Sequence, residues 1–527
     1  MPSPGPGDSQ VKRVSATDVD ERLAALNANA AAITAIASAV EGTLGPKGLN
    51  SMLVDRFGDV TITNDGSTIL EKIDVNHPAA QLLINTARAQ AEQVGDGTTT
   101  ATILAAALVA EGVKQVQRGV PVTKVIEGIE FGVERALEAL ETAARGVALD
   151  DPLLARAALV AGRHQEDLAY LALEAAKRIP LAKLTDDPAF RLGKRIVARE
   201  GAENEVVAGV ILEKQRLNQQ MPLVVAPARI LLLDDALEPE SVDQEALGTE
   251  AGFQRYLQLQ SEFQECLKKL NYLGVNCIMA ARAISEHAEE LLLDHDILAV
   301  RRVSRRDLAE VARHTGARLL KRTALRRPPA ELERSLGGAE RVEEDERLGL
   351  LRVTGGKGET TATMIVGAAT RAVRDERRRI AEDAASAVQA ALQGGLLPGG
   401  GAAEIAAFHS LAAQRAAAAG MTAYGVDCVL EALKRPLAQI VANAGLNPLE
   451  KVEEVIARSG VGGSWAVDCD TGQVADMFAL GVVDAAPVKL HALHAAGEIA
   501  CAILRINTII RKKDEQVQPE TEAGHDL

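Results

Sequence analysis

The 527-residue chain has few aromatic residues, only five cysteines and no excess of basic side chains. Aromatic residues make up 2% and the net charge is −15, so we expect no base-stacking or basic surface for nucleic acid. The cysteines form no C-x-x-C pair, which favours free thiols over a disulfide or zinc framework. We expect no segment apolar enough to cross a membrane, and residues 1–10 lack the apolar core of a signal peptide. These absences predict a cytoplasmic globular protein.

The chain is longer than one hydrophobic core usually supports, and its character changes along its length. Alanine-rich helical periodicity dominates both ends. Between them lie four strand-like runs, at 206–212, 230–233, 275–279 and 297–300, separated by helical runs. The charged stretch 301–346 is expected to form surface helices and loops, and the acidic segment 515–527 a disordered tail. The pattern predicts a helical domain built from both termini, with an α/β domain inserted between them.

The loop Gly95-Asp96-Gly97-Thr98-Thr99-Thr100 combines one carboxylate with two glycines and three hydroxyls. An apolar run follows it directly, so the loop is predicted to open a helix, where unpaired N–H groups attract phosphate. Asp96 would repel a phosphate unless a cation lay between them, which indicates Mg²⁺ with a nucleotide. A glycine turn before a threonine-capped helix explains the same residues equally well.

Five blocks of sequence, taken together and in order, resemble the chaperonin family over nearly the whole chain. They are T-L-G-P-K-G at 43–48, V-T-I-T-N-D-G-S-T-I-L at 60–70, H-P-A-A at 77–80, V-G-D-G-T-T-T-A at 94–101 and L-P-G-G-G-A-A-E at 397–404. The run A-R-I-L-L-L-D at 228–234 resembles the group II type, found in archaeal thermosomes and the eukaryotic cytosolic chaperonin. The alanine content and the absence of a Gly-Met tail are compatible with the bacterial group III subclass.

The resemblance implies a multidomain chaperonin fold of the α+β class. It comprises a mainly helical equatorial domain, a small intermediate domain and an inserted α/β apical domain that carries a helical lid protrusion. The expected boundaries are 1–143 and 396–527 for the equatorial domain, 144–208 and 359–395 for the intermediate domain, 209–358 for the apical domain and about 235–270 for the lid.

The lid segment also contains four of the chain's few aromatic residues: Phe253, Tyr256, Phe263 and Tyr272. Aromatic residues clustered on a charged helical insertion suggest a surface that is exposed in one state and buried in another. An amphipathic helix packed on the α/β core would produce the same pattern.

The resemblance also implies roles for individual residues. Nucleotide contacts are expected from Thr43, Leu44, Gly45, Pro46, Asp96, Gly97, Thr98, Thr99, Thr100, Gly400, Asp468 and Asp484. Asp96 would bind Mg²⁺, while Asp383 would activate the attacking water and Asp65 would act as a second acid. Without the family, Asp383 reads as a solvated acid on a charged helix and Asp65 as part of an Asn-Asp-Gly turn. Arg163 stands where group II relatives carry a phosphate-sensing lysine. The arginine keeps the positive charge of that lysine but not its shape.

The implied function is an ATP-driven chamber that folds non-native proteins, with hydrolysis coupled to domain closure. Its subunits would form stacked rings, eight-membered by resemblance, with built-in lids and no separate co-chaperonin. One alternative is an ATP-binding ring scaffold without folding activity. Another is a metabolic kinase or P-loop NTPase, although the nearest phosphate-loop candidate, Gly355-Gly356-Lys357-Gly358, lacks the first glycine and the final hydroxyl of that motif.

Overall fold

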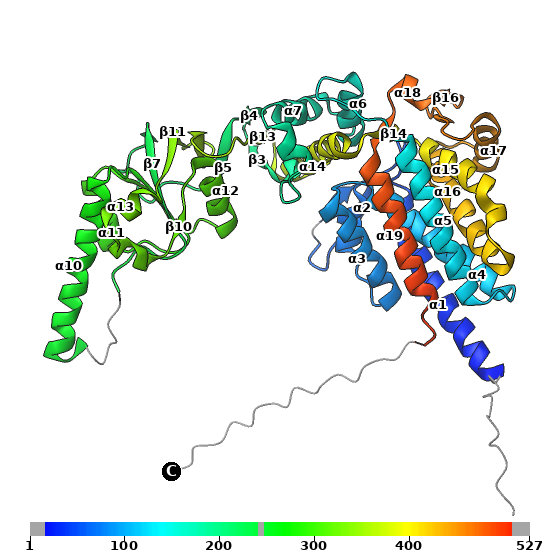
Figure 1. Ribbon diagram of the computed structural model, residues 1–527, viewed down its shortest axis with the longest axis horizontal. Coiled ribbons are helices and arrows are strands. Elements are labelled where there is room, and N and C mark those ends of the chain that lie inside the picture. Colours follow the sequence, from blue (N-terminus) through cyan, green and yellow to red (C-terminus); the bar gives the residue numbers. More distant parts are fainter. Residues whose placement is uncertain (1–15, 59, 241–246, 509–527) are drawn as a thin grey trace, which may run out of the picture.

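The computed structural model describes residues 16–58, 60–240 and 247–508, with the backbone alone at 16–22 and 372 (Figure 1). A helical body lies at one end of an elongated molecule, a sheet with flanking helices lies at the other, and a smaller body lies between them. Residues 1–10, predicted to lack a signal peptide, fall outside the described residues, and so do residues 515–527, the predicted disordered tail.

The helical body is built from both ends of the chain around one apolar core, as its periodicity predicted. Helix α4, which begins at Thr98, packs against helices from both termini. The longer helices of this body are α1 (Ala16–Glu41), α3 (Pro78–Gln93), α4 (Thr98–Gln117), α5 (Val122–Ala143), α15 (Ala402–Gln414), α16 (Ala423–Asn443), α17 (Pro448–Arg458) and α19 (Ala486–Leu504). Alanine suits these positions because it favours helix and lets neighbouring helices approach closely.

Helix α1 corrects the expectation that no segment could span a membrane. Residues Leu23–Glu41 are long enough and have a mean hydropathy of 1.6. Alanine supplies much of this hydropathy, while Leu26, Ile33 and Val40 are fully buried in the helical core. A core helix of this composition therefore passes the same test as a membrane span.

A short hairpin and one unpredicted helix follow α1. Strands β1 (Ser51–Val54) and β2 (Val60–Thr63) pair antiparallel and form the hairpin. Helix α2 (Gly66–Lys72) then begins where the sequence indicated only a turn. Strands β14 (Leu396–Pro398) and β17 (Val483–Ala485) form another small sheet, as do β15 (Trp465–Val467) and β16 (Val474–Asp476), and α18 (Met477–Leu480) follows β16.

The middle body has its own apolar core and joins the outgoing and returning parts of the chain. Strand β13 pairs in parallel with β3 and antiparallel with β4, so residues from both passes share one sheet. Its elements are α6 (Pro152–Ala161), α7 (Glu166–Lys177), α8 (Leu181–Thr185), η1 (Leu192–Lys194), β3 (Ile196–Glu200), β4 (Glu205–Val207), β13 (Thr363–Ala368) and α14 (Arg371–Gly394). Helix α14 brings the returning chain back towards the helical body (Figure 1).

The outer body is a mixed sheet with apolar clusters on both faces. Its central strands run in the order β5, β12, β11, β7, β8, β9, and β7, β8 and β9 are parallel, as the strand-helix alternation predicted. The strands are β5 (Gly209–Leu212), β6 (Val224–Val225), β7 (Ala228–Leu233), β8 (Cys277–Ala280), β9 (Leu298–Val300), β10 (Leu319–Leu320), β11 (Gly337–Asp345) and β12 (Leu350–Gly356). The flanking helices are α10 (Glu250–Tyr272), α11 (Glu286–Asp294), α12 (Arg305–Thr315), η2 (Arg322–Arg326) and α13 (Pro329–Glu333).

Strand β11 corrects the expectation of surface helices and loops over 301–346. It lies inside the sheet between β7 and β12, although most of its residues are charged. Ala339 and Val342 face the core, and the buried Glu344 accepts a hydrogen bond from the backbone N–H of Arg216. The charges therefore lie on a paired strand whose apolar side chains are too few to reveal it in the sequence.

Helix α10 agrees with the amphipathic interpretation in its second half and leaves two aromatic residues exposed in its first half. Its second half packs on the sheet through Phe263 and Leu267, as an amphipathic core helix does. Its first half projects away from the body, where Phe253 and Tyr256 stack with ring centroids 6.5 Å apart and remain exposed (Figure 1). Residues 241–246, which belong to the predicted lid, lie outside the described part of the chain.

Candidate functional site

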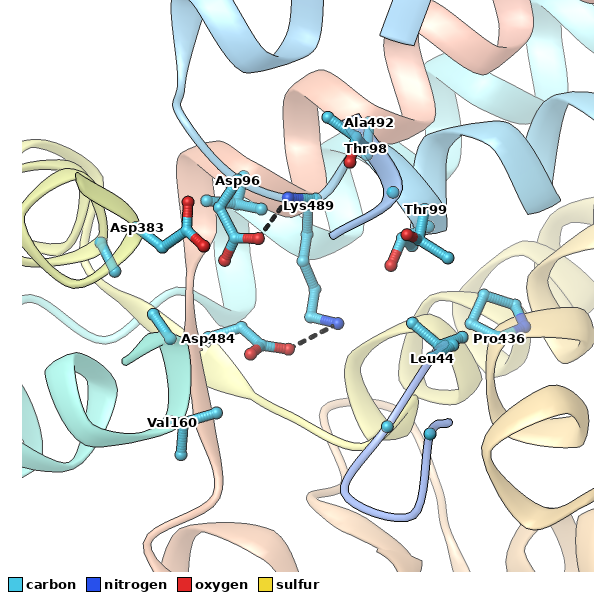
Figure 2. A pocket seen from close by; sticks show the side chains of 18 of the residues that line it. Leu44, Asp96, Thr98, Thr99, Val160, Asp383, Pro436, Asp484, Lys489 and Ala492 are labelled. Carbon is cyan, nitrogen blue, oxygen red and sulfur yellow. Dashed lines mark hydrogen bonds and ion pairs between the residues drawn. The ribbon is translucent and has the colours of Figure 1, made fainter. Parts of the chain in front are cut away.

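A cavity of about 530 Å³ opens between the helical body and helix α14 (Figure 2). This volume is in the range of small-molecule sites, about 300–1,000 Å³. The predicted site residues that line it are Thr43, Leu44, Gly45, Pro46, Asp65, Asp96, Gly97, Thr98, Thr99, Thr100, Asp383, Gly400 and Asp484. Residues from both halves of the chain therefore meet around one space.

The loop before α4 enters the cavity with a backbone that requires glycine. Gly95 and Gly97 have φ values of +85° and +82°. A Cβ on Gly95 would lie 2.4 Å from Ser386 Oγ, and one on Gly97 would lie 2.6 Å from Val488 Cγ1. Gly97 is the N-cap of the 20-residue helix α4 and provides no side-chain cap, so the helix presents free N–H groups and the positive end of its dipole to the cavity.

Asp96 and Asp383 approach this space from opposite halves of the chain (Figure 2). Burial raises the pKa of Asp383 well above its usual range, and the nearby Asp96 and Asp65 raise it further. Burial likewise raises the pKa of Asp96, whose Oδ1 accepts a 2.6 Å hydrogen bond from the Gly97 N–H. Crowded carboxylates with raised pKa values indicate a site that is electrostatically incomplete without a cation.

Asp65 has a second task in this structure, because it caps helix α2. Its carboxylate accepts hydrogen bonds from the backbone N–H and hydroxyl groups of Ser67 and Thr68, at 2.6–3.2 Å. Burial raises the pKa of Asp65, but these bonds outweigh burial and lower it overall. The carboxylate therefore stays ionised at the cavity wall.

A buried lysine that the sequence did not reveal lies beside Asp484. Lys489 Nζ is 2.9 Å from Asp484 Oδ2 (Figure 2). It also lies 2.8 Å from Glu404 Oε1. Burial alone would lower the pKa of Lys489, but Asp484 and Glu404 raise it overall, so it is charged. The only hint in the sequence was that Lys489 lies near the start of an apolar helix. Glu404 is the last residue of the block at 397–404, but the sequence assigned it no role.

Glu404 leaves one buried oxygen without a partner in the described part of the chain. The residue is buried, and its Oε2 has no hydrogen-bond partner among the described residues. An unpaired buried acceptor costs about 1–3 kcal/mol, so this oxygen lowers the stability of the nucleotide-free fold.

Arg163 also borders the cavity, in a turn where its own φ is +50°. Its Nη1 lies 2.6 Å from Glu376 Oε1, and its Nη2 lies 3.8 Å from Asp383 Oδ2. The guanidinium is therefore held by α14, close to the predicted catalytic carboxylate.

One predicted site residue does not reach this cavity. Asp468 does not line it; its carboxylate accepts bonds from Asp470 N–H and Thr471 Oγ1 in the turn after β15. The turn after β15 instead contacts the loop that follows α1 through an ion pair between Lys47 and Asp470, 2.6 Å long. The segment Gly355–Gly358 lies at the end of β12 in the outer sheet and opens no helix, so it cannot serve as a phosphate loop.

The donor set fits a magnesium ion shared with phosphate. Within the described ranges, no group of three or more His, Cys, Asp or Glu side chains could hold a metal by itself. Mg²⁺ typically takes one or two carboxylates and completes its octahedron with phosphate oxygens and water. Asp96, beside the open helix N-terminus, would supply the one protein ligand that such a site needs.

Comparisons with known proteins agree with this geometry. The family model of the TCP-1/cpn60 chaperonin family matches residues 36–514. A thermosome subunit of Pyrococcus abyssi is 34% identical over 514 residues, covering 94% of this chain and 92% of its own. The thermosome subunit beta of Archaeoglobus fulgidus is 36% identical over 505 residues, covering 92% and 91%. The crystal structure of a group III chaperonin in the open state matches with a TM-score of 0.84 and 43% identity, covering 93% of this chain and 100% of that one.

These matches span all three bodies, so they confirm the multidomain chaperonin fold as well as the resemblance of the sequence blocks. The chain belongs to the TCP-1/cpn60 chaperonin family, whose members hydrolyse ATP to fold proteins inside a ring chamber.

Proposed function

We propose that the cavity binds ATP with Mg²⁺ and that Asp383 orients the attacking water when the chamber closes. The observation that carries this proposal is that Asp96 and Asp383, each with a raised pKa, line the same cavity beside the N-terminus of α4. Mg²⁺ bound through Asp96 would neutralise charge on the phosphates. Phosphoryl transfer needs little more than positioning and charge stabilisation, which these residues can provide.

The other residues that line the cavity are proposed to contact different parts of the nucleotide. The N–H and hydroxyl groups of Gly97, Thr98, Thr99 and Thr100 would hold the phosphates, with Asp65 as a second acid nearby. Asp484, held by Lys489, would contact the ribose. The wall formed by Thr43, Leu44, Gly45, Pro46 and Gly400 would enclose the rest of the nucleotide.

Refolding a denatured enzyme with and without ATP tests the function as a whole. We expect recovery of enzyme activity only with ATP and Mg²⁺, in particles that negative-stain microscopy shows as stacked rings. Rings that bind ATP without raising recovery would instead support a scaffold. We further propose eight subunits per ring and a cytoplasmic location. We also propose that no separate co-chaperonin is needed, because each chain carries its own projecting helix α10.

The projecting part of α10 is proposed to close the chamber. Replacing residues 241–257 with a short Gly-Ser linker should preserve rings and ATP hydrolysis, because the buried Leu259, Phe263 and Leu267 stay in place. The same change should abolish protection of a trapped client from protease. A client that stays protected in the shortened protein would contradict the lid.

The hairpin β1–β2 is proposed to contact a neighbouring subunit. Its strands pair only with each other in the described structure, and Met52, Val54, Val60 and Ile62 are each more than half exposed. Exposed apolar edge strands are ready to pair with another chain, and rings of this family need such contacts.

Lysine at both Met52 and Ile62, which face each other across the hairpin, should therefore shift rings towards single subunits. Light scattering after size-exclusion chromatography measures this shift. Leu181→Lys places the same charge on an exposed leucine of the middle body and serves as the control. Intact rings in the hairpin variant would exclude the hairpin as a contact that assembly requires.

A further inference from the structure

One buried glutamine lies directly behind the loop that carries Asp96. Gln90, on α3, is fully buried and does not line the cavity. Its amide nitrogen donates to the backbone carbonyl of Asp96 at 2.8 Å and to that of Val488 at 3.1 Å. One side chain thus joins the loop before α4 to the first turn of α19.

The orientation of this amide is set by its partners. Two carbonyl acceptors can be served only by the NH₂ group, so the amide oxygen of Gln90 must face the other way. There it meets Nδ1 of His491, one turn further along α19 than Val488. With a hydrogen on Nδ1, all of the principal hydrogen-bonding groups of Gln90 are used.

The loop also presses against this glutamine. A Cβ on Gly97 would lie 3.0 Å from Gln90 Nε2, so the backbone passes as close to the amide as a glycine allows. Val488, the second acceptor, immediately precedes Lys489, which holds Asp484 and Glu404. Gln90 is therefore placed to keep the Asp96 side and the Lys489 side of the cavity at a fixed separation.

We infer that Gln90 is a positioning residue that aims the Asp96 carboxylate at magnesium; this rests on the proposed role of Asp96. Holding the Asp96 carbonyl fixes the rotation of that residue's backbone and hence the direction of its side chain. Without the amide, the mutual repulsion among Asp96, Asp65 and Asp484 is free to turn the carboxylate away. Two buried carbonyl groups would also lose their donor.

Gln90→Met tests the inference, because methionine has a similar length and no donor. Loss of a group that orients a metal ligand typically lowers metal affinity about 10–100-fold. We expect the Mg²⁺ concentration for half-maximal binding of a non-hydrolysable ATP analogue, measured by calorimetry, to rise about tenfold. Saturating Mg²⁺ should restore most of the binding. Amide hydrogen exchange at residues 94–100 of the nucleotide-free protein should become faster.

Gln389→Met is the matched control. Gln389 is also buried, and it makes the same kind of triple contact: it accepts from Leu192 N–H and donates to the carbonyls of Leu184 and Phe190. It lies outside the cavity lining, so its loss should lower the melting temperature without changing the Mg²⁺ dependence. If both variants lose stability and neither changes Mg²⁺ dependence, Gln90 is only structural and the inference is wrong.

A second variant covers the case in which Gln90→Met does not fold. His491→Phe keeps both bonds that the Gln90 amide donates but removes the partner of its oxygen, so the shift in Mg²⁺ dependence should be smaller and in the same direction. An unchanged dependence there would overturn the inference. Asp96→Asn separates this result from the proposed function: if Asp96→Asn binds Mg²⁺ and nucleotide normally, the site assignment itself fails; if it loses Mg²⁺ dependence while the Gln90 and His491 variants do not, only this inference fails.

Discussion

Asp383→Asn should slow ATP hydrolysis about 10²–10⁴-fold, the usual contribution of a positioned general base, while ATP binding stays close to that of the unmodified protein. The reason is that Asp383 lies on α14, outside the loop and helix N-terminus that are proposed to hold the phosphates. Asparagine retains the size of the side chain and removes the negative charge that would orient water. Single-turnover measurements at saturating Mg²⁺ separate the chemical step from binding.

Glu382→Gln is the matched control for this substitution. Glu382 is the adjacent carboxylate on α14, but it accepts a 3.0 Å bond from Arg378 Nε on the same helix and does not line the cavity. Its loss should leave turnover unchanged. Equal rates for Asp383→Asn and the unmodified protein would remove Asp383 from the mechanism.

The raised pKa of Asp383 also predicts a change in stability. A carboxyl whose pKa is higher in the folded than in the unfolded protein favours folding at low pH, and this contribution is lost as the pH rises through its folded pKa. Above the unfolded pKa of this carboxyl, the raised folded pKa therefore lowers the stability of the nucleotide-free fold. Asp383→Asn should raise the melting temperature at pH 7, and the gain should shrink at lower pH.

Local signals predicted much of the helical body because its elements begin and end on residues that dictate the backbone. Helix α3 begins at Pro78, since proline favours the first turn of a helix. Helix α4 begins at Thr98 because Gly97 takes a left-handed φ just before it. Asp96, Thr98 and the glycines could be predicted to act together for the same reason: they are consecutive.

What could not be predicted depends on contacts between distant segments. The Lys489–Glu404 pair joins α19 to α15, and neither residue stands in a pattern that reveals the other. Strand β11 is held inside the sheet by both neighbours rather than by its own apolar residues. Asp468 was placed by a loose match to the family, but the turn after β15 uses its carboxylate internally. Family resemblance supplied Asp383, which its charged helix alone would have left as a surface acid.

Asp96→Asn should weaken Mg²⁺-dependent ATP binding about 10–100-fold, which corresponds to about 1.4–2.8 kcal/mol. Asparagine retains an oxygen that can accept the 2.6 Å hydrogen bond from Gly97 N–H, so the turn before α4 should persist. What is lost is the negative charge on the proposed magnesium ligand. Calorimetric titration with ATP, with Mg²⁺ and then with a chelator, measures the difference.

The electrostatics of the nucleotide-free cavity sharpen this prediction. Burial is the main cause of the raised pKa of Asp96, and the neighbouring Asp484 and Asp65 add to it. Removing one charge from this cluster should stabilise the nucleotide-free protein at neutral pH, so lost affinity cannot be ascribed to unfolding. Glu92→Gln removes one charge from an exposed position four residues earlier and should change neither property. Normal Mg²⁺-dependent affinity in Asp96→Asn would show that the ion is held elsewhere. It would also contradict the proposed joint role of Asp96 and Asp383 in ATP hydrolysis.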